Sequence, residues 1–292
     1  MAVRTPWRRW HELKARHWSS LVACRSIVRG LPLLATARPK TPLRVLCIMA
    51  FDALPMLRRG KPLPLSQRKV LAAWLDFAAC ANAAFDQKDY CRREFRRTLR
   101  MLQESGLSSS VVEYLRRLCD LERRRPAPGG DDWQFPHAVA YREAVVRLSL
   151  GMTAVVAGRG RRLDDAVAAT RHDADFNLLF RIVMQCQILD DVLDYPRDSA
   201  AGLPSFLTAS SSLVQAFEQA CLTAARYADI RHLPRSGDMF PLRAALFLVS
   251  TAARLVLALG RWRHRARFEQ SFTKHVCGRR RLAPDGVGDV PA

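Results

Sequence analysis

Residues 187–198 of this 292-residue sequence read QILDDVLDYPRD and place four aspartates within nine positions. In a helix, Gln187, Asp191 and Asp194 are spaced i, i+4 and i+7 with Asp190 beside them, so their oxygens share one face. The surrounding positions are strongly apolar: Ile182, Val183, Met184, Ile188, Leu189, Val192 and Leu193. Carboxylates on a buried helix repel one another and lose hydration, which costs several kcal/mol unless a cation or paired donors meet them. The segment therefore predicts a buried acidic helix that needs a counter-charge.

Hard divalent cations such as Mg²⁺ prefer oxygen clusters of this kind and complete their coordination with water and substrate phosphates. The alternatives are a solvated acidic face and a set of salt bridges to arginine, which is abundant in this chain. A bound metal is favoured over both.

A second acidic stripe lies upstream. Asn82, Asp86, Asp89 and Arg93 are spaced 4-3-4, with Tyr90 close by. Alone, such a stripe is best explained as an exposed polar face. Two acid-bearing helices that face each other across a helical bundle could instead hold Mg²⁺ ions bridging a diphosphate, with arginines completing the anion clamp. An allylic carbon–oxygen bond could then ionise inside an apolar cavity.

Helical periodicity extends over the rest of the chain. Residues 66–104 contain no Gly or Pro, with Ser66 as the predicted N-cap and Gly106 as the stop, and they form one long helix or two with a kink. No stretch shows sustained period-two alternation, so the predicted fold is all-α. Further helices are expected at 108–124, 139–156, after Asp164–Asp165, at 174–195 up to Pro196, near 210–230 and at 240–270.

These motifs carry a family resemblance. Gln187–Asp198, together with Gly202–Thr208 (GLPSFLT), resembles the second aspartate-rich region of class I isoprenoid synthases, the trans-prenyltransferase and squalene/phytoene synthase superfamily. Phe85–Tyr90 (FDQKDY) stands where that superfamily has its first acidic helix, and Tyr141–Leu150 lies between them as a cavity-lining helix would. The resemblance covers roughly residues 60–260. It implies a single-domain orthogonal helical bundle around a central cavity.

The resemblance also implies roles for individual residues. Asp190, Asp191 and Asp194 would bind metal, with Asp198 in the outer shell, and Asp86 with Asp89 would face them, so that Asp86, Asp190 and Asp191 are the catalytic candidates. Instead of Asp-Asp-x-x-Asp, the first helix has Asn82 four residues before Asp86, so an amide replaces one carboxylate. Two or three Mg²⁺ ions are expected. The substrate-binding candidates are Tyr90, Arg93, Arg142, Arg147, Arg181, Gln187 and Arg197. The expected activity is release of pyrophosphate from an allylic prenyl diphosphate, by prenyl transfer or by terpene-synthase chemistry.

Charge and cysteine usage bear on organisation and compartment. The chain carries 47 Lys+Arg against 27 Asp+Glu, a net charge of +20, and the excess is concentrated at its ends. We expect a poorly ordered basic extension over 1–48, the helical domain over 49–272 and a flexible tail over 273–292. Eight singly spaced cysteines fit a reducing cytoplasm, and the basic ends allow peripheral contact with the inner membrane. The apolar segment Leu242–Leu259 includes two arginines, so a packed helix is expected rather than a membrane span. Homodimerisation is expected by analogy.

Two other functions remain open. His172 and Asp173, with His137 upstream and Asp190 downstream, could form the site of an all-helical metal-dependent phosphohydrolase, although Asp173 is better explained as a helix cap. A non-catalytic basic helical protein could instead bind an anionic membrane or nucleic acid through its arginine-rich ends, with interfacial tryptophans at Trp7, Trp10, Trp18 and Trp262. No nucleic-acid motif is present, so a nucleic-acid partner is not expected.

Overall fold

The computed structural model describes residues 63–86, 91–126, 135–158, 162–210, 212–231 and 240–279, and within these ranges it contains helices and no strand. The predicted all-α class is confirmed, while the isoprenoid-synthase type and its central cavity stay predictions. The expected N-terminal extension over 1–48 lies outside the described residues. The helices are α3 (Leu65–Phe85), α4 (Arg92–Glu104), α5 (Ser108–Arg123), α6 (Phe135–Val156), α7 (Leu163–His172), α8 (Ala174–Leu193), α9 (Tyr195–Ala200), α10 (Leu213–Ala228) and α11 (Phe240–Arg279).

The predicted run over 66–104 consists of two helices, α3 and α4, which pack against each other. Ser66 is not the N-cap, because α3 begins at Leu65 with Pro64 in the capping position. Gly106 ends α4 as predicted: its φ of +75° is the left-handed conformation that glycine adopts freely. The Gly106 amide donates to the Gln103 carbonyl, and the Leu107 amide donates to the Leu102 carbonyl, the hydrogen-bond pair of a Schellman motif.

Other helix boundaries follow local chemistry. Asp173 caps α8, since its carboxylate accepts from the amides of Asp175 and Phe176. Helix α7 begins at Leu163, before Asp164 and Asp165 rather than after them as predicted. Both carboxylates lie in its first turn, where negative charge interacts favourably with the helix dipole. Pro196 follows the end of α8 and lies in the first turn of α9, where its missing N–H costs nothing.

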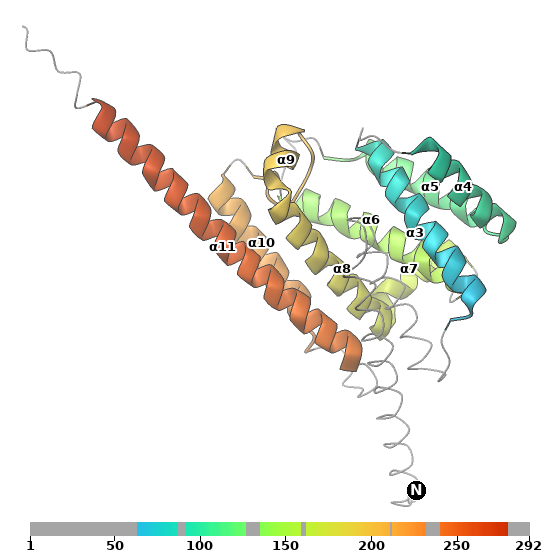
Figure 1. Ribbon diagram of the computed structural model, residues 1–292. Helices are drawn as coiled ribbons and strands as arrows, with labels where there is room; N and C mark the ends of the chain where they lie inside the picture. The colour runs from blue at the N-terminus through green and yellow to red at the C-terminus, as the bar shows by residue number, and fades with distance from the viewer. Residues whose placement is uncertain are drawn as a thin grey trace, which may run out of the picture.

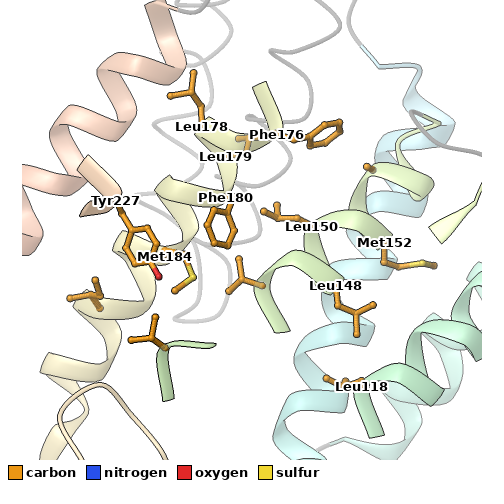
Figure 2. Close-up of a cluster of buried hydrophobic side chains, with 14 of the residues drawn as sticks. Leu118, Leu148, Leu150, Met152, Phe176, Leu178, Leu179, Phe180, Met184 and Tyr227 are labelled. Atoms are coloured by element: carbon orange, nitrogen blue, oxygen red, sulfur yellow. The ribbon is translucent and has the colours of Figure 1, made fainter. Parts of the chain in front are cut away.

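Helices α6 and α8 form the centre of the bundle (Figure 1). Helix α6 contacts α3, α5, α7 and α8, and α8 also contacts α7, α9, α10 and α11. The apolar core lies between these layers, and Figure 2 shows Leu150 of α6 with Phe180 and Met184 of α8 and Tyr227 of α10. The centre of the fold is therefore built by the two helices that carry Arg142 and Asp191.

Two glycines permit close helix contacts. A Cβ on Gly151 of α6 would lie 3.0 Å from the backbone nitrogen of Val167 on α7. A Cβ on Gly260 of α11 would lie 2.8 Å from the ring of Phe217 on α10. Both separations are shorter than normal van der Waals contact, so each glycine sets how closely its helix approaches its neighbour.

Helix α11 is longer than predicted and extends to Arg279, and its C-terminal end projects past the other helices (Figure 1). Its segment Leu242–Arg263 is long and apolar enough to cross a membrane by length and composition alone. The sequence predicted a packed helix here, yet only 28% of the most apolar window is buried. The helix packs on α8 and α10, and its opposite side is exposed.

Candidate functional site

The two acidic segments identified in the sequence reach the same end of the bundle, around the guanidinium of Arg142 on α6. Asp86 is at the C-terminal end of α3, Asp191 lies in the last turn of α8, and Asp198 lies on α9. All three carboxylates act electrostatically on Arg142. Burial lowers the pKa of Arg142, but the surrounding anions, Asp191 first among them, raise it above its ordinary value.

Arg142 connects three parts of the chain. Its Nη2 donates to Asp191 Oδ1 at 3.1 Å and to the Pro204 carbonyl at 2.8 Å, and its Nη1 donates to Gln187 Oε1 at 3.4 Å. Its Nε is buried and has no hydrogen-bond partner among the described residues. A guanidinium offers five N–H donors, so Arg142 retains an unused donor in a buried position.

Asp191 is buried, with 2% of its surface exposed. Its Oδ2 accepts the backbone amide of Phe206 at 2.7 Å, and its Oδ1 accepts Arg142. Burial raises the pKa of Asp191 to about 6, although Arg142 and the Phe206 amide both act to lower it. Asp198 and Asp190 raise it further by repulsion. The predicted need for a counter-charge is met in this structure by Arg142 and one backbone donor.

The loop after α9 is held over this pair. The φ of +62° at Gly202 turns the chain, and the Leu203 amide donates to the Asp198 carbonyl at 2.8 Å. Thr208 Oγ1 then accepts the Ser205 amide at 2.8 Å and donates to the Leu203 carbonyl at 2.9 Å. The GLPSFLT segment is therefore a closed turn that presents the Pro204 carbonyl and the Phe206 amide to the Arg142–Asp191 pair.

Asp86 belongs to a second network on the neighbouring helices. Its Oδ1 accepts from Arg125 Nη2 at 3.0 Å, and its Oδ2 accepts from Asn82 Nδ2 at 3.3 Å. Arg125 Nη1 also donates to Glu122 at 3.2 Å, and the Tyr141 hydroxyl donates to Glu122 at 2.7 Å. Burial and the bond to Glu122 raise the pKa of Tyr141. Tyr141 precedes Arg142 on α6, so the two networks meet on that helix.

The remaining acidic candidates differ in exposure. Asp190 is exposed, Asp194 is half-buried at the junction of α8 and α9, and Asp198 is buried. Burial raises the pKa of the Cys186 thiol, and the charge of Asp190 raises it further.

Asp89 and Tyr90 lie outside the described residues. Arg93 and Arg197 are exposed on α4 and α9.

Two predicted substrate-binding arginines lie elsewhere. Arg147 donates to the carbonyl and hydroxyl of Thr170 at 3.1 and 3.2 Å, and its guanidinium carbon lies 3.6 Å from the Phe180 ring centre. Its Nη2 also lies 3.9 Å from an oxygen of Glu143, one turn earlier on α6. Arg181 Nη1 donates to three carbonyls at the end of α10: those of Arg226, Tyr227 and Asp229. The structure brings neither arginine into the hydrogen-bond network of Arg142.

Carboxylate oxygens suit a hard cation such as Mg²⁺, but in this structure they already accept hydrogen bonds. Among the described residues, no three His, Cys, Asp or Glu side chains gather closely enough to share a metal ion. Both oxygens of Asp86 and both oxygens of Asp191 accept hydrogen bonds from nitrogen donors. Metal binding at these residues would therefore have to share or displace the hydrogen bonds from Arg125 and Arg142.

The phosphohydrolase set finds less support. Asp173 is occupied as the cap of α8, as expected, and the side chains of His137 and His172 are exposed. Both imidazoles therefore lie at the surface rather than in an enclosed site.

The sequence pattern does not identify Arg125, Glu122 or the backbone of Phe206 as members of the site. The i, i+3 spacing of Glu122 and Arg125 is a recognisable helix-surface pair. Their contacts with Asp86 and Tyr141 depend on how α3 and α5 both pack on α6, which the spacing does not reveal. Comparison of the chain with family models, curated proteins and solved structures gives no match.

Proposed function

We propose that this protein is a Mg²⁺-dependent enzyme of the class I isoprenoid-synthase type that acts on an allylic prenyl diphosphate and releases pyrophosphate. The observation that carries the proposal is the position of Arg142, half-buried on α6 with its guanidinium against α8 and within electrostatic range of Asp86, Asp191 and Asp198. Two acidic segments about a hundred residues apart thus surround one cation that is suited to binding an anion.

The arginines would exchange partners when substrate binds. Arg142 and Arg125 now donate to carboxylates, and their planar guanidinium groups fit phosphate oxygens equally well. The released oxygens of Asp86 and Asp191, with those of Asp190 and Asp194, would hold Mg²⁺. The metal would neutralise the charge of the departing pyrophosphate. The unused Nε of Arg142 adds a donor for the same anion.

The polyprenyl chain would need a water-poor environment, because an allylic cation reacts with water. The interior between α6 and α8 is apolar, with Leu150, Phe180, Met184 and Ile188 all buried, and Figure 2 shows the first three. These side chains would exclude water from the reacting carbon. We place the pyrophosphate end at Arg142 and the hydrocarbon end toward this interior.

The test is incubation of the full-length protein with prenyl diphosphates of several chain lengths, with and without Mg²⁺. Pyrophosphate release and organic products would be measured together. Asp190→Asn is the most informative variant, because Asp190 is exposed and its replacement should leave the fold intact. We expect Asp190→Asn and Asp86→Ala to lose at least about tenfold in rate, whereas Asp120→Ala on the surface of α5 should match the unmodified chain.

Normal release by both variants would refute the site assignment. Orthophosphate in place of pyrophosphate, with loss of activity in His172→Ala, would favour the phosphohydrolase instead.

A further inference from the structure

Helix α11 has two apolar faces. One face is buried against α8 and α10 and includes Leu246, Ala253 and Leu257. The other carries five large apolar side chains that are between 60% and 72% exposed: Phe247, Leu248, Leu255, Leu259 and Trp262. We call these five residues the α11 apolar surface. A soluble helix normally shows one apolar stripe opposite a polar one, so the second face needs a partner.

The five side chains form one continuous stripe. At about 100° per residue they fall within an arc of about 120°, directly opposite the buried positions, and they extend along about 22 Å of helix. The intervening positions do not interrupt this surface with charge, because Ala258 is small and the Thr251 hydroxyl donates to the Phe247 carbonyl at 2.8 Å. Contiguous exposed apolar surface of this kind marks a site of interaction with protein or lipid.

Charge around the stripe indicates its partner. Arg254 and Arg263 are exposed at its two edges, and the sequence continues with Arg265 and Arg267. The whole chain carries a net charge of +20. A second copy of the chain would bring these arginines next to one another, which is unfavourable. An anionic lipid surface would instead receive the apolar side chains between its acyl chains and the arginines among its headgroups.

We propose that the α11 apolar surface docks this protein on an anionic lipid bilayer, with α11 lying in the plane of the membrane. Packing of the opposite face on α8 and α10 holds α11 to the bundle and favours this in-plane position over a spanning one. Trp262, the most exposed of the five side chains, lies at the interface between headgroups and acyl chains. Lipid docking through this surface is independent of the proposed enzymatic activity.

The experiment is co-sedimentation of the full-length protein with vesicles of phosphatidylcholine alone or mixed with phosphatidylglycerol. We expect binding to the mixed vesicles that weakens with salt. The double variant Leu255→Gln/Leu259→Gln should bind these vesicles at least about tenfold more weakly than the unmodified chain, because two apolar side chains no longer enter the bilayer. Val112→Gln, at a 66% exposed apolar residue on α5, is the matched control and should bind normally.

A second measurement locates the contact. Lipids brominated on their acyl chains should quench part of the tryptophan fluorescence of the unmodified chain, and this part should be absent in Trp262→Phe. Circular dichroism of the double variant verifies its fold. Unchanged vesicle binding by a folded double variant would overturn the proposal and assign binding to the basic ends. Conversion of a dimer to a monomer by the same substitutions, without loss of lipid binding, would also overturn it and assign the surface to a second copy.

Discussion

Arg142 Nη2 donates to Asp191 Oδ1 at 3.1 Å, and this bond joins the two central helices at the end of the bundle where the acidic segments meet. The same nitrogen donates to the Pro204 carbonyl, and the other Asp191 oxygen accepts the Phe206 amide. One ion pair therefore fixes α6, α8 and the loop after α9. Any ligand that competes for Arg142 or Asp191 must also act on this loop.

The first prediction concerns the stability of this ion pair. Asp191→Ala should lower the free energy of unfolding by about 3 kcal/mol, because it leaves the half-buried Arg142 charge without its carboxylate and the Phe206 amide without its acceptor. Chemical denaturation followed by circular dichroism measures the change. Asp120→Ala is the control and should leave stability nearly unchanged, since Asp120 pairs with exposed arginines on its own helix. Equal free energies of unfolding for Asp191→Ala and Asp120→Ala would mean that Asp191 is not needed to stabilise the Arg142 charge.

The second prediction concerns pH. Burial raises the pKa of Asp191 from 3.8 to about 6, so between these values the folded chain holds a proton that the unfolded chain has lost. Stability from this group is therefore fully present below pH 4 and is lost as pH rises through about 6, a change of about 3 kcal/mol. Denaturation of the unmodified chain and of Asp191→Asn across this range isolates the effect, because asparagine does not titrate. The stability of the unmodified chain relative to the variant should rise as the pH falls from 7 to 4, and a constant difference would refute the raised pKa.

The acidic segments show what the sequence could predict about the site. The spacing of Gln187, Asp191 and Asp194 predicted a shared helix face, and the apolar neighbours predicted burial, which Asp191 confirms. The identity of the counter-charge could not be predicted, because Arg142 lies 49 residues away on α6 and is one of many arginines. Only helix packing decides which arginine meets which carboxylate.

The sequence predicted the all-α class correctly and the ends of individual helices less accurately. Local signals such as the positive φ at Gly106 and the capping carboxylate of Asp173 act within one turn, and both predictions are confirmed. Ser66 failed as an N-cap because Pro64, with its fixed φ, already occupies that position. The apolar residues of the second α11 face are present in the sequence, where they predict a helix packed in the core. The sequence does not reveal how many faces of a helix are covered by other helices.

The third prediction uses two glycines that serve different purposes. Gly106→Asn should change stability little, because asparagine tolerates the left-handed conformation and a Cβ there meets no atom within 4 Å. Gly151→Asn should destabilise the protein by about 3 kcal/mol or more, since its Cβ would lie 3.0 Å from the Val167 backbone nitrogen and α7 would have to move. Thermal unfolding of both variants distinguishes the backbone conformation required at Gly106 from the close helix packing required at Gly151. Equal losses would mean that α6 and α7 are not in close contact.

The fourth prediction tests whether Arg181 is structural or binds substrate. Arg181 Nη1 donates to three carbonyls at the C-terminal end of α10, where such groups have no partner within the helix. Arg181→Met should therefore lower the free energy of unfolding by about 2 kcal/mol and speed amide exchange near residues 226–230. Arg181→Lys should recover only part of this loss, because one ammonium cannot reproduce the planar fork. If the enzyme activity is present, the KM for prenyl diphosphate should stay unchanged in Arg181→Met and rise in Arg142→Lys. A raised KM in Arg181→Met with full stability would instead place Arg181 among the substrate-binding residues.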